Sequence, residues 1–273
     1  MMVGDYIKGL KVQKEPLYRK VPIYFLTYLN EFMQNIAIKK CTTFVNSRLL
    51  FNKYKDQAKT LHEIRTTTLT LKDFYQRYDS FDNSNGTVNI LSTGRISYEK
   101  GVIEVVRVAA KLTKEGLKIN VHFVGWEDKV DKPVERDIKA EAVRLGISDR
   151  VYLHGKKNVG PELFEMYRMS QIFMLPSQSD FEGFPRTVWE AMANCVSVIT
   201  TGVGSIPFFI ENNKHALIVP PRDFEALFSA TKRIINDQSL RKLLLSNAFS
   251  YVKDITLEIQ TKRMLNLLSR NDV

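Results

Sequence analysis

Short apolar runs alternate with amphipathic stretches along most of the chain after residue 87. The apolar runs are bounded by turn-forming residues and predict strands at 88–92, 119–124, 151–154, 172–175, 196–200 and 216–219. Apolar positions at helical spacing predict helices at 101–113, 133–145, 161–169, 186–193 and 224–236. Short strands that alternate with helices predict an α/β fold, in which helices cover both faces of a parallel sheet.

The first third of the chain follows a different pattern. Apolar side chains recur at helical spacing over 18–39 and predict an amphipathic helix. Such a helix either lies on a membrane surface or packs against the protein, and we expect packing. A short strand is predicted at 42–46, and Ser47 is a suitable N-cap for a helix that runs to about residue 55.

A run of turn-forming residues at 82–86 is the clearest linker signal in the sequence. It predicts an N-terminal segment over 1–85 and an α/β domain over 86–255. Residues 256–270 have the pattern of an amphipathic helix. The third part, 256–273, is therefore expected to be a helix that packs back on the N-terminal segment.

The net charge is +10, and residues 1–90 carry 14 Lys and Arg against 8 Asp and Glu. Such a bias suits an anionic membrane surface, a phosphorylated substrate or nucleic acid, and it is equally common on ordinary protein surfaces. We rank nucleic acid last, because no single predicted element interleaves basic and aromatic residues.

Cys41 and Cys195 form no CxxC pair, and the four histidines show no metal-ligand spacing. No apolar run reaches the roughly 18 residues of a membrane span, and the N-terminus lacks a signal-peptide pattern. We therefore expect no metal and a cytoplasmic location.

Loops after the strands carry the candidate chemistry, because parallel α/β sheets bind ligands at the carboxyl ends of their strands. The loop after the first strand contains Gly94, Arg95 and Lys100. Glycine lets the backbone approach a ligand closely, and two cations suit a diphosphate. Gly155, after the third strand, is placed to receive a flat base through backbone groups. The alternative for the first loop is a solvated basic turn.

Two carboxylates stand eight residues apart around the loop that follows the fourth strand. Glu182 lies on a turn, and Glu190 lies on the helix that begins after it. The backbone of Gly183 and Phe184 offers N–H groups near the helix start, which favours anions. Glu190 can accept hydrogen bonds from both hydroxyls of a ribose, and Glu182 can do the same for a hexose. The alternative is a surface ion pair between Glu190 and Arg186 at i, i+4.

Three motifs in order resemble the C-terminal, donor-binding domain of GT-B glycosyltransferases of family 4, the glycosyl transferases group 1 domain. Gly94-Arg-Ile-Ser-Tyr-Glu-Lys-Gly101 looks like the family's GR…EKG loop. Glu182-Gly-Phe-Pro-Arg-Thr-Val-Trp-Glu190 looks like its E-x7-E signature, and Gly202-Val-Gly-Ser-Ile-Pro207 like its next glycine turn. The resemblance covers 88–235 and implies a Rossmann-like, GT-B C-terminal domain.

The resemblance also implies roles for these residues. Arg95 and Lys100 would neutralise the donor diphosphate, and Glu190 would hold the ribose. Glu182, with the backbone of Gly183 and Phe184, would grip the transferred sugar. Glu182 is sometimes argued to be a nucleophile, but a front-face mechanism without a covalent intermediate is the commoner reading.

The implied function is retaining transfer of a hexose-type sugar from a UDP- or GDP-sugar to a glycan or lipid-linked acceptor in surface polysaccharide biosynthesis. No metal or cofactor would be required. Peripheral contact with the anionic inner face of the membrane is a further expectation.

The sequence departs from the family at two places. Asn194-Cys195 replaces a small residue followed by Gly, and the N-terminal segment is short enough to be the remnant of an acceptor-side domain. The alternative function is therefore a non-catalytic donor-binding module, or a subunit of a split glycosyltransferase that needs an N-terminal domain or partner chain. A nucleotide-sugar epimerase is a third class.

Overall fold

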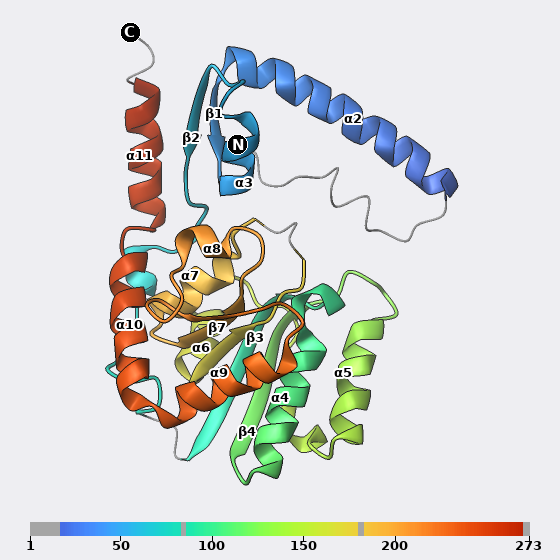
Figure 1. The fold of residues 1–273 in the computed structure, drawn as a ribbon, viewed down its shortest axis with the longest axis vertical. Coiled ribbons are helices and arrows are strands. Elements are labelled where there is room, and N and C mark those ends of the chain that lie inside the picture. The colour runs from blue at the N-terminus through green and yellow to red at the C-terminus, as the bar shows by residue number, and fades with distance from the viewer. Residues whose placement is uncertain (1–16, 83–85, 180–182, 270–273) are drawn as a thin grey trace. The chain divides into compact units, whose positions relative to one another are not determined.

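The structure is a computed structural model that describes residues 17–82, 86–179 and 183–269 (Figure 1). It divides into two compact units. The first holds the described residues of Met1–Thr66, Asp180–Phe184 and Glu258–Val273, and the second holds those of Thr67–Ser179 and Pro185–Leu257.

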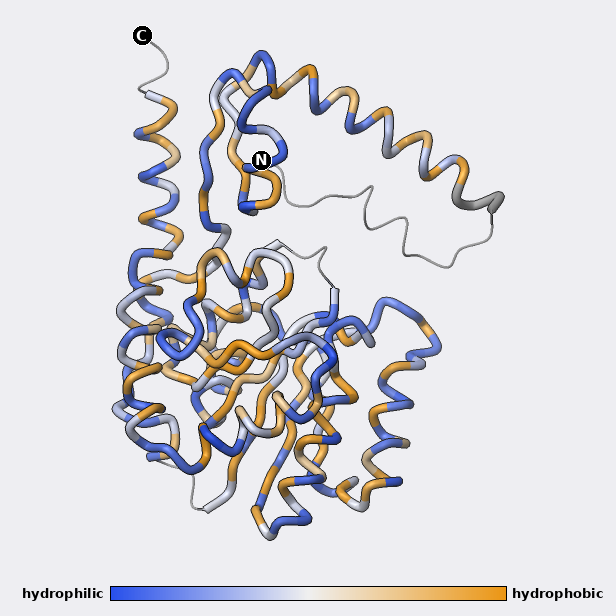
Figure 2. Tube along the Cα trace, viewed as in Figure 1, coloured by the Kyte–Doolittle hydropathy of each residue, from blue (hydrophilic) through white to orange (hydrophobic). Residues whose placement is uncertain are grey.

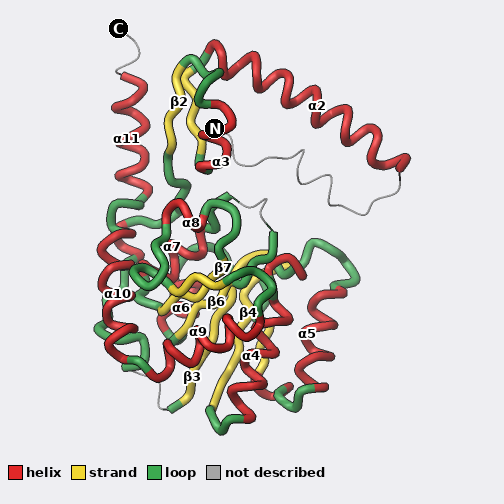
Figure 3. Tube along the Cα trace, viewed as in Figure 1, coloured by secondary structure: helices red, strands yellow, loops and turns green. Residues whose placement is uncertain are grey.

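The larger unit is built on a six-stranded parallel sheet with the order β5-β4-β3-β6-β7-β8. Its strands are β3 (Thr87–Arg95), β4 (Lys118–Trp126), β5 (Val151–Leu153), β6 (Ile172–Leu175), β7 (Ser197–Thr201) and β8 (Leu217–Val219). Helices surround the sheet in Figure 3. The predicted α/β class and parallel sheet are thus confirmed.

Helices connect successive strands of this sheet and continue after the last one. They are α4 (Val102–Lys114), α5 (Pro133–Arg144), α6 (Pro161–Arg168), α7 (Arg186–Ala193), α8 (Ile206–Phe209), α9 (Phe224–Asn236) and α10 (Gln238–Val252). Short 3-10 turns η1 (Leu71–Asp73), η2 (Tyr98–Lys100) and η3 (Ser148–Arg150) complete the unit.

The main core of the unit lies between the sheet and the helices α4, α5 and α9. Ile90 on β3 and Val121 on β4 are fully buried there, together with Val105 and Ala109 of α4 and Ile234 of α9. Figure 2 shows apolar residues along the strands and an alternation of apolar and polar residues along the helices. The helix α10 packs against α7.

Residues 67–82, which the sequence groups with the N-terminal segment, belong to the sheet unit. The Arg77 guanidinium donates to the carbonyl oxygens of Cys195, Arg168 and Ser170 at 2.8, 2.8 and 2.5 Å. Asp79 and Arg241 form a buried ion pair. These side chains bind the segment before β3 to α10 and to the ends of α6 and α7.

Cys195, at the end of α7, takes the backbone conformation that is typical of a glycine. Cys195 has a φ of 48°, the left-handed conformation in which glycine is usual after a helix. The Val196 N–H donates to Ala191 O at 3.0 Å and the Cys195 N–H to Met192 O at 3.2 Å, which is a Schellman motif. The Cys195 side chain is buried against Leu245 and Phe249.

The smaller unit contains α2 (Leu17–Lys40), β1 (Thr42–Val45), α3 (Arg48–Tyr54), β2 (Thr60–Glu63) and the described part of α11 (Leu257–Ser269) that belongs to it. The strands β1 and β2 are parallel, and Ile38, Val45, Leu50 and Tyr54 form a small core. The Arg65 N–H donates to Gln260 Oε1 at 3.0 Å, which joins α11 to the segment after β2.

The long helix α2 leaves much of its apolar surface open. Phe25, Leu26, Phe32 and Met33 each expose more than half of their area. None of the described helices is both long and apolar enough to cross a membrane.

Candidate functional site

The chain changes direction across the sheet between β3 and β6. Strands β4 and β5 follow on one side of β3, and β7 and β8 follow on the other side of β6. Ligands of doubly wound sheets bind at such a switch point, outside the carboxyl ends of the strands. The side chains and loops at this edge are therefore the candidate site.

Three glycines lie side by side at the carboxyl ends of β3, β4 and β5. Gly94 is the register partner of Gly125, whose N–H donates to Gly155 O at 2.9 Å. A Cβ on Gly125 would lie 1.7 Å from Gly94 O, so only glycine fits there. A Cβ on Gly94 or Gly155 would meet no atom within 4 Å, so a ligand can approach the backbone closely at these two positions.

The loop after β3 contacts the segment after β6. Gly101, with a φ of 68°, begins α4, and a Cβ there would lie 2.2 Å from Pro176 O. The Gln178 N–H donates to Glu99 O at 2.7 Å. These contacts hold the loop that carries Arg95 and Lys100 against the chain that leads to residues 180–182.

Arg95 lies at this edge with acidic partners. Its guanidinium is 3.6 Å from Asp128 and 4.0 Å from Glu99, and about half of the side chain is exposed. Exposed ion pairs of this kind contribute about 0–1 kcal/mol, so a diphosphate can displace them. Lys100 follows on η2 and is half-buried.

Glu190 is buried on α7, with 4 % of its surface exposed. The Tyr167 hydroxyl, from α6, donates to Glu190 Oε2 at 2.8 Å and lies 2.7 Å from the Thr93 hydroxyl on β3. Thr93 directly precedes Gly94. The carboxylate is thereby connected to the end of β3 at the switch point. Within the described residues, no ion pair joins Glu190 to Arg186.

Burial raises the pKa of Glu190, and the Tyr167 hydrogen bond and the Arg186 charge partly oppose that rise. Burial also raises the pKa of Tyr167 well above its usual value, so the phenol keeps its proton. A neutral donor therefore faces a carboxylate in a site of low exposure.

The remaining candidates lie on the loop before α7. Phe184 is buried and Gly183 is half-buried, and both precede Pro185 at the start of α7. Glu182 lies outside the described residues.

Two histidines lie on the sheet close to Gly155. His122 Nδ1 is 3.0 Å from His154 Nε2, and the two rings stack together with Tyr152. Burial, with the nearby His154, lowers the pKa of His122 to about 4. Burial, with Lys157 nearby, also lowers the pKa of His154. Both rings are therefore neutral near pH 7. His122 is a buried residue of β4, and His154 is an exposed residue that follows β5.

Comparison with known proteins decides the family. The model of the family described as glycosyl transferases group 1 matches residues 79–250, which is more than half of the chain. This chain belongs to the glycosyl transferases group 1 family. The match includes the whole sheet and every candidate site residue named above.

Relatives in the group 1 family are distant in sequence. The α-D-kanosaminyltransferase of Streptomyces kanamyceticus is 26 % identical over 159 residues, which cover 58 % of this chain and 39 % of that protein. The lipopolysaccharide core biosynthesis mannosyltransferase LpcC of Rhizobium leguminosarum is 27 % identical over 168 residues, covering 59 % and 44 %. The chain therefore spans less than half the length of these two relatives.

Solved structures show the same fold. Anabaena Alr3699/HepE, crystallised in complex with UDP, is 16 % identical and superposes with a TM-score of 0.72 over 84 % of this chain and 64 % of its own. At this identity the likeness establishes the GT-B fold, and the site of this chain has to be argued from its own residues.

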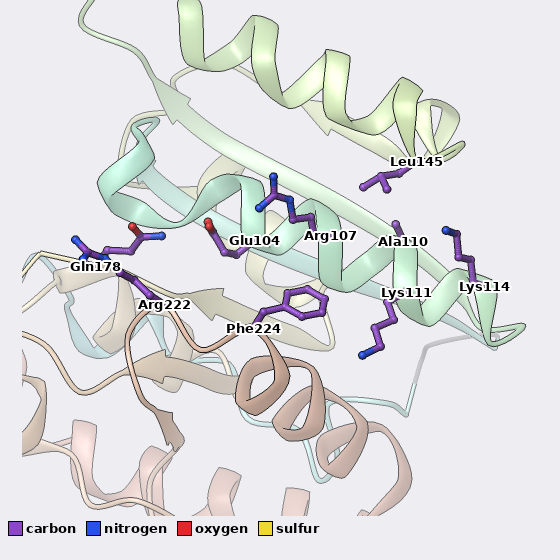
Figure 4. A pocket seen from close by; sticks show the side chains of 9 residues that line it. All are labelled: Glu104, Arg107, Ala110, Lys111, Lys114, Leu145, Gln178, Arg222 and Phe224. Atoms are coloured by element: carbon purple, nitrogen blue, oxygen red, sulfur yellow. The ribbon is translucent and has the colours of Figure 1, made fainter.

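A groove on the outer side of α4 is a second hollow in this group 1 domain (Figure 4). Its volume is about 570 Å³, and Arg222 and Lys114 lie toward opposite ends. The cations between them are paired, since Arg107 contacts Glu141 at 2.7 Å and Lys111 contacts Glu225 at 2.8 Å.

Sequence reasoning missed Tyr167, Thr93 and Asp128. Tyr167 occupies an inward position of α6 and looks like an ordinary core aromatic, because no local pattern shows where its hydroxyl points. Asp128 lies two residues after Trp126, the last residue of β4. Its position in a loop after a strand could have indicated it as a site residue. Among the described residues, no group of three or more His, Cys, Asp or Glu is placed to hold a metal.

Proposed function

We propose that the sheet unit binds a nucleotide-diphosphate sugar at the switch point and that the protein is a retaining glycosyltransferase. The observation that carries this is the buried Glu190 carboxylate, connected through Tyr167 and Thr93 to the glycine-rich end of β3. A buried acceptor of this kind needs hydroxyl donors from a ligand, and the two hydroxyls of a ribose supply them. The UDP in the HepE structure supports a nucleotide as the ligand class.

Each part of the donor has a proposed partner. Arg95 and Lys100 would exchange their present contacts for the diphosphate, which offers stronger, charge-assisted hydrogen bonds. Gly155 would receive the base through its backbone. Glu182, with the backbone of Gly183 and Phe184, would hold the transferred hexose.

The chemistry follows from this placement. The acceptor hydroxyl would attack the anomeric carbon from the side that the diphosphate leaves, so a new C–O bond forms as the bond to phosphate breaks. An oxygen of the departing diphosphate would take the acceptor proton, and Arg95 and Lys100 would stabilise its charge. This route uses no metal and no covalent sugar–enzyme intermediate, and the configuration at the anomeric carbon is retained.

The acceptor class is proposed from the relatives and the charge. LpcC is named for lipopolysaccharide core biosynthesis, which supports a glycan or lipid-linked acceptor in surface polysaccharide assembly. The basic front third and the exposed apolar side chains of α2 support peripheral contact with an anionic membrane at its inner, cytoplasmic face.

A second candidate is a donor-binding module that needs an N-terminal partner for turnover. Its support is the smaller unit, where two parallel strands form a sheet on their own and α2 exposes Phe25, Leu26, Phe32 and Met33. Parallel sheets are usually larger and covered on both faces. Further strands on a partner would cover these surfaces.

Turnover separates the two candidates. The full chain is incubated with a panel of UDP- and GDP-sugars and glycan acceptors, nucleotide release is followed, and the product anomer is assigned by NMR. Release that depends on the acceptor and gives the donor's anomeric configuration supports the transferase. An inverted product would refute the retaining mechanism, and donor binding without release would favour the module.

A further inference from the structure

Three side chains from different elements form a continuous series of hydrogen bonds beneath the switch point, which we call the relay. Thr93 comes from β3, Tyr167 from α6 and Glu190 from α7, and their exposed fractions are 6, 0 and 4 %. The oxygen–oxygen distances along the chain are 2.7 and 2.8 Å. Such short distances in a buried site indicate well-formed bonds.

The number of hydroxyl protons fixes which group donates in each hydrogen bond of the relay. Tyr167 has one hydroxyl proton, and the Glu190 carboxylate can only accept, so the phenol donates to Glu190. Its other neighbour, the Thr187 carbonyl at 3.4 Å, is too distant to compete. Thr93 must then donate to the Tyr167 oxygen, and each bond strengthens the next by polarisation.

The arrangement occupies only one carboxylate oxygen of Glu190. Within the described part of the chain, Oε2 accepts the hydrogen bond from Tyr167 and no hydrogen bond reaches Oε1. A phenol donor orients the carboxylate and leaves its charge uncompensated, whereas a buried arginine or lysine would neutralise it. The group stays an ionised acceptor with one oxygen available to a ligand.

We propose that Tyr167, itself held by Thr93, is a positioning residue that fixes the Glu190 carboxylate for the hydroxyls of the donor's ribose. This inference rests on the proposed function, because it takes the ribose assignment of Glu190 as given. It adds two side chains that contact no ligand and act through Glu190.

The relay affects the pH dependence of nucleotide binding. Burial raises the pKa of Glu190, the Tyr167 hydrogen bond and the Arg186 charge lower it, and the Asp73 charge raises it. Loss of the Tyr167 hydroxyl removes one of the lowering influences. Nucleotide affinity, which needs ionised Glu190, should then begin to fall at a higher pH than in the wild type.

Calorimetry with UDP and GDP on the full chain, over pH 5 to 8, tests the relay. Tyr167→Phe should weaken binding about tenfold, as expected for one lost bond to a charged group, and should move the pH midpoint upward. Thr93→Val should shift both in the same direction by less, and Thr93→Ser should restore wild-type behaviour. Thr231→Val, which removes a buried hydroxyl from α9, is the matched control and should change neither.

The outcomes distinguish a failure of this inference from a failure of the proposed function on which it rests. Glu190→Gln is measured alongside: wild-type affinity in that variant, or no nucleotide binding by the wild type, would overturn both. If Glu190→Gln binds weakly while Tyr167→Phe keeps the wild-type affinity and pH midpoint, the relay alone is wrong. A lower melting temperature of Tyr167→Phe with an unchanged pH midpoint of binding would mean that Tyr167 only packs, and would also overturn the relay.

Discussion

The buried ion pair between Asp79 and Arg241 should be a large local contribution to the stability of the sheet unit. The Asp79 carboxylate accepts from Arg241 Nε at 2.8 Å, Arg241 Nη2 at 2.9 Å and the Phe81 N–H at 3.1 Å. Arg241 Nη1 also donates to the Ile234 and Ile235 carbonyls, both at 2.8 Å. The pair thus holds the segment before β3 against the junction of α9 and α10.

Asp79→Asn keeps the shape but removes the charge, and its amide N–H₂ then faces a guanidinium that is still buried. Removal of one partner from a buried pair costs about 3–5 kcal/mol. For a unit of this size, that loss lowers the melting temperature by roughly 10 °C. Burial raises the pKa of Asp79, but the Arg241 hydrogen bonds and charge outweigh it and leave the pKa lowered. This stabilisation is therefore present above the unfolded pKa and is lost as pH falls through the folded one.

Urea unfolding at pH 7, followed by circular dichroism, measures the effect. Glu225→Gln breaks an exposed ion pair with Lys111 and serves as the control, with an expected loss below about 1 kcal/mol. A free energy of unfolding for Asp79→Asn within 1 kcal/mol of that control would refute the reasoning, since it would mean that the pair only offsets its own desolvation.

Two further predictions concern the elements around the site. Gly101→Ala should lower the free energy of unfolding by at least about 2 kcal/mol and weaken nucleotide binding, because its Cβ would meet Pro176 O. Gly116→Ala is the control. Its Cβ would lie in open space at a φ of 89°, so the variant should lose only about 1 kcal/mol through backbone strain. Denaturant titration and calorimetry measure both. His122, with a folded pKa of about 4, should make the wild type lose about 3 kcal/mol as pH falls from 6.5 to 4, because only the unfolded chain takes up the proton there. His122→Gln should remove that part of the slope, and an unchanged slope would contradict it.

Much of the sheet unit could be predicted from the sequence, because its strands are short apolar runs separated by helices. The strand at 172–175 and the helix at 186–193 agree with β6 and α7 to the residue. The strand β3 extends past the predicted 88–92 to Arg95, since pairing with β4 overrides the weak strand preference of Gly94.

Other elements lacked a local signal. The helix α10 was not predicted, because its buried half includes the charged Arg241 while the apolar Leu243 lies exposed on the other side, which blurs the amphipathic pattern. Asp237 also both ends α9 and caps α10. The strand β2 is half-buried throughout and has no alternation to reveal it.

For the candidate site, linear motifs could indicate Arg95, Lys100 and Glu190, because loops after parallel strands meet at one edge. They could not indicate Tyr167 or Thr93. Tyr167 stands 74 positions after Thr93 and 23 positions before Glu190, and only the fold brings the three side chains together.

Nucleotide binding tests the central claim most directly. UDP and GDP are titrated by calorimetry into the wild type, into Glu190→Ala, and into Glu165→Ala, which removes an exposed acid paired with Arg168 on α6. We expect one of the nucleotides to bind, Glu190→Ala to weaken that binding by about 1–3 kcal/mol, and Glu165→Ala to leave it unchanged. Equal affinity of the wild type and Glu190→Ala, or no binding of either nucleotide, would contradict the assignment of the switch-point edge as the donor site.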